Sequence, residues 1–154
     1  MTTVLEQPAV KENRRLFPGI IFNFRVRAEE SNNSIMVADF EAIPGCEPPR
    51  HVHSIEDEVF IIKEGYGTFY PGNQVIEAGP GDVVFFPADV PHHFKIHSEK
   101  ITGTLIATPG YIEHFFRELS IPYEGDSIPS LEPPTQAQIK HLVEVTESYG
   151  MKFV

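Results

Sequence analysis

Two histidines stand one residue apart in the stretch GCEPPRHVHSIEDEVFIIKEG, residues 45–65, and acidic residues follow them closely. On a β-strand, His51 and His53 project from the same face, close enough for one cation to bind both. Glu58 can join them from the next strand if the intervening residues form a turn, and two histidines with one carboxylate suit divalent iron and similar metals. His92, which follows a proline turn, is a fourth candidate ligand. The alternative is an ordinary polar loop between strands.

The composition limits the possible partners and compartments. The chain has 154 residues, enough for one domain with its own core, and a formal net charge of -10. This charge argues against a surface for phosphates or anionic lipid, so we expect no nucleic-acid or membrane partner. A single cysteine, Cys46, excludes an internal disulfide framework. Residues 1–15 contain no apolar run typical of a signal peptide, and we expect a cytoplasmic protein.

The segment from residue 19 to about residue 108 is rich in Val, Ile and Phe, interrupted by short turn-like clusters. Alternation of apolar and polar residues over 19–27 and 35–43 predicts strands with one buried face. Further strands are expected at residues 58–63, 67–70, 74–77, 82–86, 92–97 and 101–107. So many short strands at close spacing predict an all-β barrel or sandwich.

After Pro109 the apolar pattern changes to the period of a helix. The apolar residues of this stretch are Ile112, Phe115, Phe116 and Leu119. A second helix is expected to begin at Thr135, which forms a capping box with Gln138, and to end near Gly150. We therefore predict a single domain over residues 1–154, with a barrel at about 19–108 and a helical extension at 109–154.

Five residues match every fixed position of the first motif of the cupin superfamily, G(x)5HxH(x)4E(x)6G: they are Gly45, His51, His53, Glu58 and Gly65. The second motif, G(x)5PxG(x)2H(x)3N, is matched at Gly81, Pro87 and His92, but Asp89 and Ile96 replace its second glycine and its asparagine. The stretches PPRHVHSIEDEVF, PGYIEHFFRELS and ESYGMKF resemble the bacterial quercetin-dioxygenase-like branch of the superfamily.

The resemblance implies a cupin double-stranded β-helix, a small jelly-roll barrel with two C-terminal helices. It also implies that His51, His53, Glu58 and His92 bind one divalent transition metal inside the barrel. The donor set leaves the metal open among Fe, Mn, Ni, Cu, Co and Zn. Four protein ligands leave coordination positions for water, O2 or a chelating substrate, as in catalytic sites.

If Glu58 and His92 point inward, strand alternation predicts which apolar residues line the substrate pocket: Met36, Phe40, Phe60, Ile62, Phe94 and Ile96. An apolar, aromatic cavity around one metal suits a small neutral or enolic aromatic ligand. The remaining acids and histidines are expected elsewhere: Asp57 in a turn or a salt bridge, Glu56 in solvent, His93 on the outer face behind the ligands, and His97, His114 and His141 in surface or structural roles.

The resemblance implies a metal-dependent dioxygenase that acts on a small enolic or aromatic, flavonol-like compound, with Glu58 as the base. Two alternatives stay open. One is a metal-dependent isomerase, cyclase or lyase that does not use O2, and the other is a non-catalytic small-molecule-binding cupin. Because cupins usually pair, we also expect a homodimer, formed through the strand at 19–27 and the helix that carries Phe115 and Phe116.

Overall fold

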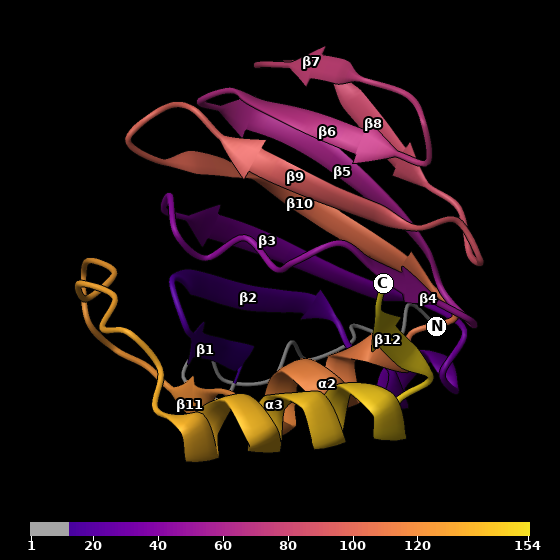
Figure 1. Ribbon diagram of the computed structural model, residues 1–154, viewed down its shortest axis with the longest axis vertical. Coiled ribbons are helices and arrows are strands. Elements are labelled where there is room, and N and C mark those ends of the chain that lie inside the picture. The colour runs from indigo at the N-terminus through magenta and orange to yellow at the C-terminus, as the bar shows by residue number, and fades with distance from the viewer. Residues whose placement is uncertain (1–12) are drawn as a thin grey trace, which may run out of the picture.

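The computed structural model describes residues 13–154. Most of the segment 1–15, in which no signal peptide is expected, therefore lies outside the described residues. Two antiparallel sheets face each other (Figure 1). The strands of the larger sheet are, in spatial order, β11 (Ile121–Pro122), β1 (Arg14–Phe17), β2 (Ile20–Val26), β3 (Met36–Ala42), β10 (Ile101–Thr108), β5 (Asp57–Glu64) and β8 (Val83–Phe86). Those of the smaller sheet are β12 (Met151–Phe153), β4 (His51–His53), β9 (His92–Ile96), β6 (Gly67–Pro71) and β7 (Ile76–Ala78).

The predicted all-β fold is confirmed, as a sandwich of two sheets rather than a closed barrel. No pair of strands within residues 13–154 joins one sheet to the other. The expected alternation is clearest in β3, where residues 36, 38, 40 and 42 are buried and the residues between them are partly exposed. The core therefore lies between the inner faces of the two sheets.

Helix α2 (Ile112–Glu118) closes one end of this core with the apolar face that its sequence predicts. The Phe116 ring lies 4.4 Å from the Phe22 ring and 5.6 Å from the Phe17 ring, so aromatic contacts attach the helix to β1 and β2. A short 3-10 helix, η1 (Glu29–Ser31), joins β2 to β3.

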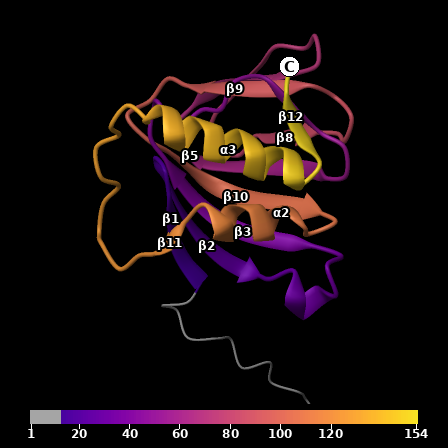
Figure 2. The ribbon, with the colours of Figure 1, turned by 60° about the horizontal axis from the view of Figure 1, so that its bottom comes forward.

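Helix α3 (Gln136–Ser148) begins with the predicted capping box. The Thr135 hydroxyl accepts a hydrogen bond from the Gln138 backbone N–H, and the Gln138 side chain accepts one from the Thr135 N–H. The helix ends before Gly150, whose φ of +75° favours glycine and turns the chain into β12. Figures 1 and 2 show both α-helices at the same end of the sandwich. Among residues 13–154, no helix has both the length and the apolar character needed to cross a membrane.

Strands β1, β11 and β12 lie outside the range 19–108 expected for the β-sheet part. Strand β1 precedes that range and pairs with β2. Strand β12 follows the last helix and pairs with β4, with Phe153 opposite His51. The segment after Pro109 therefore adds one strand to each sheet, β11 and β12, in addition to supplying two helices.

Much of the surface expected for a homodimer is used for contacts within the chain. Phe115 and Phe116 are buried in the core, and β2 is paired on both sides, with β1 and with β3. Helix α2 packs its aromatic face on its own sheet, which is why that face is not free for a partner. The homodimer stays a prediction, but we no longer expect the aromatic face of α2 to form its interface.

Candidate metal centre

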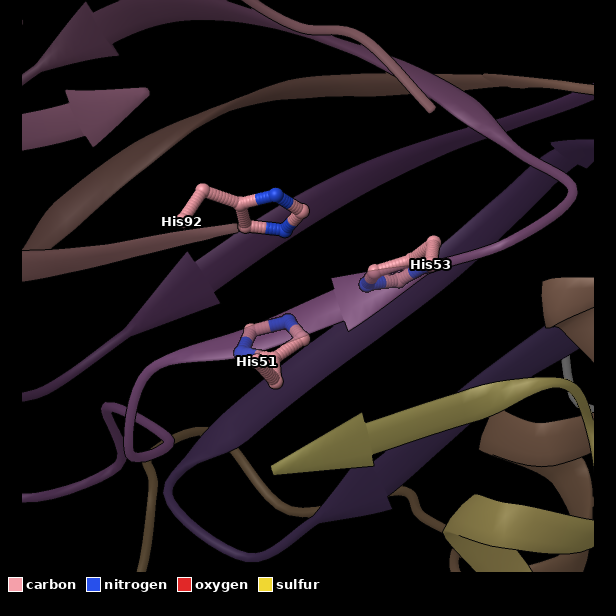
Figure 3. A group of neighbouring side chains, drawn as sticks. All are labelled: His51, His53 and His92. Carbon is pink, nitrogen blue, oxygen red and sulfur yellow. The ribbon is translucent and has the colours of Figure 1, made fainter. Parts of the chain in front are cut away.

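Three histidine side chains of the smaller sheet meet at one point. His51 and His53 project from the same face of β4, and His92 on β9 lies directly opposite His51 in the antiparallel register. The His51 and His92 ring centroids are 4.5 Å apart, and each lies 5.0 Å from that of His53. One ring nitrogen from each residue lies within 4.8 Å of the others (Figure 3). This spacing allows one metal ion to be held by all three.

The carboxylate of Glu58 reaches the same point from the facing sheet. Its Oε2 atom lies 3.3 Å from His92 Nε2 and 3.6 Å from His53 Nε2. Glu58 is buried on β5, where it pairs with Phe86 of β8. The four residues that the sequence selects are therefore brought together between the sheets, with three donors on one side and the carboxylate on the other.

Two of the histidines have their orientation fixed by backbone carbonyls. His51 Nδ1 lies 2.9 Å from the Pro49 carbonyl oxygen, and His92 Nδ1 lies 3.0 Å from the Val90 carbonyl oxygen. Because a carbonyl can only accept a hydrogen bond, each Nδ1 must carry the hydrogen. In the neutral ring Nε2 is then unprotonated, and its lone pair is free to bind a metal. This is the arrangement found behind metal-binding histidines.

Two ring nitrogens of the cluster are buried without a hydrogen bond, although the Glu58 carboxylate lies 3.3 and 3.6 Å from them. His53 Nε2 and His92 Nε2 have no hydrogen bond, although both are inaccessible to solvent. Leaving a buried polar atom unsatisfied costs about 1–3 kcal/mol. A divalent transition metal binds imidazole nitrogen and carboxylate oxygen and would satisfy both atoms, so the residues present fit such an ion.

The electrostatics of the cluster favour the protonation states that bind metal. Burial, and then the positive charges of His92 and His53, lower the pKa of His51 to about 4. Burial alone would raise the pKa of Glu58, but the neighbouring His53 and His92 outweigh it and lower this pKa to about 2. At neutral pH, His51 is therefore neutral and Glu58 is ionised, as a metal ligand must be.

The cluster opens into a cavity of about 770 Å³, within the usual range for small-molecule sites. Three of the predicted lining residues, Phe40, Phe60 and Phe94, line it. Its other end is covered by residues that the sequence analysis did not select, from the segment 129–134 and from one face of α3. The α3 residues are Gln138, His141, Leu142 and Thr146.

The other three predicted lining residues, Met36, Ile62 and Ile96, are buried in the core and do not line the cavity. Alternation correctly places them on inner faces, but it does not say how far along a strand the cavity extends. Ile62 and Ile96 follow Glu58 and His92 by four residues each, about 13 Å along an extended strand. They fill the opposite end of the sandwich.

Glu56 is not solvated, contrary to our expectation. Its side chain is only 2% exposed, and Oε2 lies 3.6 Å from His53 Nδ1. The turn between β4 and β5 folds this side chain inward, which strand alternation cannot reveal. Asp57 takes the expected turn role, because its Oδ1 accepts a hydrogen bond from the Ala88 N–H.

The remaining histidines lie apart from the cluster. His93 faces away from it and stacks on Tyr70 with a centroid distance of 4.3 Å. His97 contacts the Thr68 hydroxyl, and His114 contacts the Asn33 side chain. His141, expected in a surface or structural role, is exposed on α3 and also lines the cavity.

The turn before His92 contains the substituted position of the second motif. Asp89, which replaces the usual glycine, has a φ of +62°, in the left-handed region. Aspartate tolerates this region better than most residues because its short side chain can bond locally. The Asp89 N–H donates to the His53 carbonyl, so the turn is also tied to β4.

Comparison with known proteins agrees with this geometry. A family model for the cupin domain matches residues 38–117. Quercetin 2,3-dioxygenase of Bacillus subtilis (strain 168) is 30% identical over 144 residues, which are 92% of this chain and 42% of that protein. The chain thus spans about two fifths of the length of this curated relative.

Solved structures share the fold at lower identity. A Klebsiella pneumoniae protein with a double-stranded β-helix domain is 22% identical with a TM-score of 0.53, covering 71% of this chain and 89% of its own. KdgF from Halomonas sp. is 16% identical with a TM-score of 0.53, covering 60% and 80%. Since the family model matches more than half of the residues, including all four that meet at the cluster, the chain belongs to the cupin family.

Proposed function

We propose that the chain is a metal-dependent dioxygenase that acts on a small enolic or aromatic compound of the flavonol type. One observation carries the proposal: three histidines and Glu58 converge at the wall of a cavity that is otherwise mainly apolar and aromatic. The similarity to the quercetin 2,3-dioxygenase of Bacillus subtilis supports this choice of chemistry.

In this proposal the metal is held by His51, His53, His92 and Glu58. When bound, a divalent transition metal would polarise a substrate oxygen and allow electron transfer to O2. The donor set accepts Fe, Mn, Ni, Cu, Co or Zn, so it does not choose among them.

Glu58 is assigned as the base that takes the enolic proton. Its Oε2 lies within 3.3–3.6 Å of two histidine nitrogens, so a hydroxyl held at the cluster is within its reach. The enolate left behind carries negative charge on carbon, where O2 adds, and both oxygen atoms enter the ring-cleaved product. Glu58 returns the proton to that product.

The cavity walls support a flat, uncharged substrate. Phe40, Phe60 and Phe94 can pack against an aromatic ring on the sheet side. Among the described residues that line the cavity there is no lysine or arginine. A strongly anionic substrate would have no counter-charge from a permanent cation of the protein, so a neutral or enolic compound is favoured.

The test begins with elemental analysis of the purified protein beside a His51→Ala, His92→Ala double variant. We expect nearly one metal per chain in the first and none in the second. Oxygen uptake with quercetin is then measured for the wild type, Glu58→Gln and the exposed-site control Glu77→Gln. We expect uptake with the wild type and the control and at least a hundredfold loss with Glu58→Gln.

Each other outcome has a distinct meaning. Full turnover by metal-loaded Glu58→Gln would contradict the role of Glu58 as the base. Substrate conversion without O2 consumption would replace the dioxygenase by an isomerase, cyclase or lyase. A wild type that takes up no Fe, Mn, Ni, Cu, Co or Zn would overturn the enzyme proposal and favour a small-molecule-binding cupin.

A further inference from the structure

We propose that Glu56 is a positioning residue of the metal centre: its carboxylate holds the hydrogen on His53 Nδ1, so that His53 Nε2 faces the metal. The inference rests on the proposed metal site and adds to it a residue at a variable position of the first motif, between His53 and Glu58. It concerns a side chain that would bind no metal itself.

The contact is between two buried atoms that have no hydrogen-bond partner. Glu56 is among the least exposed side chains of the chain, and its Oε2 lies 3.6 Å from His53 Nδ1. Neither atom makes a hydrogen bond to any other described group. The distance is that of an ion pair, and it is about 0.8 Å longer than a charge-assisted hydrogen bond of about 2.8 Å.

The comparison with the other two histidines points to the same role. His51 and His92 each have Nδ1 within 3.0 Å of a backbone carbonyl two residues earlier in the chain. His53 Nδ1 has no such carbonyl, and the Glu56 carboxylate takes that place. All three rings then have an acceptor behind Nδ1 and present Nε2 to the common point.

The turn that carries Glu56 is fixed on both sides. Ser54 donates from its backbone N–H and its hydroxyl to the Gly150 carbonyl, at 3.0 and 2.7 Å. On the other side, Asp57 accepts from the Ala88 N–H at 2.7 Å. The inward direction of Glu56 is therefore set by the fold and not by a loose loop.

Burial of the Glu56 carboxylate, in addition to that of Glu58, destabilises the folded protein, because this group loses its hydration without gaining a full set of hydrogen bonds. Beside a metal-binding imidazole it has a use, since it fixes the ring and makes Nε2 a stronger donor. Removing such a partner typically weakens metal binding about 10–100-fold.

The experiment measures Zn²⁺ affinity by competition with a chelator, in the full chain. The variants are Glu56→Ala, the nearly isosteric Glu56→Gln, the exposed-carboxylate control Glu77→Gln, and His51→Ala, which removes a proposed ligand. We expect a loss of about 10–100-fold for Glu56→Ala and a smaller loss for Glu56→Gln, whose amide oxygen can still accept. Glu77→Gln should bind like the wild type.

A spectroscopic measurement separates positioning from a general structural effect. In the Zn²⁺-loaded wild type, the NMR signal of the His53 Nδ1–H proton should lie downfield of the His51 and His92 signals, because its acceptor is charged. In Glu56→Gln the His53 signal should move upfield while the other two stay in place.

The outcomes are separable. Glu56→Ala with wild-type Zn²⁺ affinity and an unmoved His53 signal would overturn the inference. If Glu56→Ala does not fold, Glu56→Gln decides: weaker binding with the upfield shift supports the inference, and unchanged binding with an unmoved signal overturns it. If the wild type binds no Zn²⁺, or if His51→Ala binds Zn²⁺ as tightly as the wild type, the proposed metal site itself is overturned.

Discussion

His51 and His92 lie directly opposite each other in the antiparallel register of β4 and β9, with their ring centroids 4.5 Å apart. Side chains opposite one another in such a pair point to the same face, so the backbone ladder itself brings these two donors together. Strand β4 is also paired on its other side with β12, where Phe153 lies opposite His51. The centre of the site is thus held by a sheet and not by loops.

The neighbours His92 and His93 provide a matched pair of variants on this sheet. His92→Ala should reduce bound metal from about one per chain to less than a tenth, because it removes a donor from the proposed set. His93→Ala should leave the metal content unchanged, since His93 stacks on Tyr70 on the other face of β9. Elemental analysis of both variants, purified in parallel, checks this. Equal metal loss in the two would show that the site depends on β9 in general and not on His92 as a ligand.

Much of the fold and the proposed ligand set could be predicted from the sequence, since both depend on local rules. The HxH spacing and strand alternation place His51, His53 and Glu58 on inner faces. The helix that carries Phe115 and Phe116 follows from its apolar period, and the start of α3 follows from the capping residues Thr135 and Gln138.

Other features depend on long-range pairing or on turn geometry, which local rules do not determine. Strand β12 pairs with β4 across about a hundred residues of sequence, and three residues at the end of a chain carry little strand signal. Glu56 stands in a turn, where no alternation fixes the direction of a side chain. The extent of the cavity along each strand is also set by three-dimensional packing, so alternation does not reveal that Met36, Ile62 and Ile96 lie in the core and outside the lining of this cavity.

Substitution of Met36 tests whether this residue stabilises the core without contributing to the metal site. Its side chain is fully buried in the core and lies outside the cavity wall. Met36→Ala should lower the free energy of unfolding by about 2–5 kcal/mol, the usual cost of such a truncation, without changing metal content in the folded protein. Urea denaturation and elemental analysis measure the two effects. Val37→Ala, at a partly exposed neighbour on the other face of β3, serves as the control and should cost less.

Cys46 lines the cavity with a thiol that should be poorly reactive. Burial, and then the negative charge of Glu47, raise its pKa to about 12. Because the thiolate is the reactive form, roughly a thousandfold less of it is present at pH 8 than for a thiol with the ordinary pKa. Reaction with a coloured disulfide reagent should be at least a hundredfold slower in the native protein than in concentrated urea. Similar rates in both conditions would contradict the raised pKa.

The stability of the metal-free protein should fall as the pH falls from about 6.5 to 4, in part because of His51. Burial lowers the pKa of this histidine from 6.5 to about 4 in the folded state. Because its pKa is lower in the folded state, His51 takes up its proton at a lower pH in the folded state than in the unfolded state. The stabilisation is therefore complete above pH 6.5 and is lost as the pH falls through 4. The two pKa values correspond to about 3 kcal/mol at most.

His53 has an opposite shift, because Glu58 and Glu56 outweigh the effect of burial and raise its pKa. The contribution of His51 is therefore isolated by comparing the wild type with His51→Gln, which cannot titrate. Urea unfolding at pH 7 and pH 4, in the presence of a chelator, measures both proteins. We expect the wild type to lose about 1–3 kcal/mol more than the variant between these two pH values. An equal loss would mean that His51 titrates near its ordinary pKa, and that the cluster does not keep its imidazole neutral for a metal.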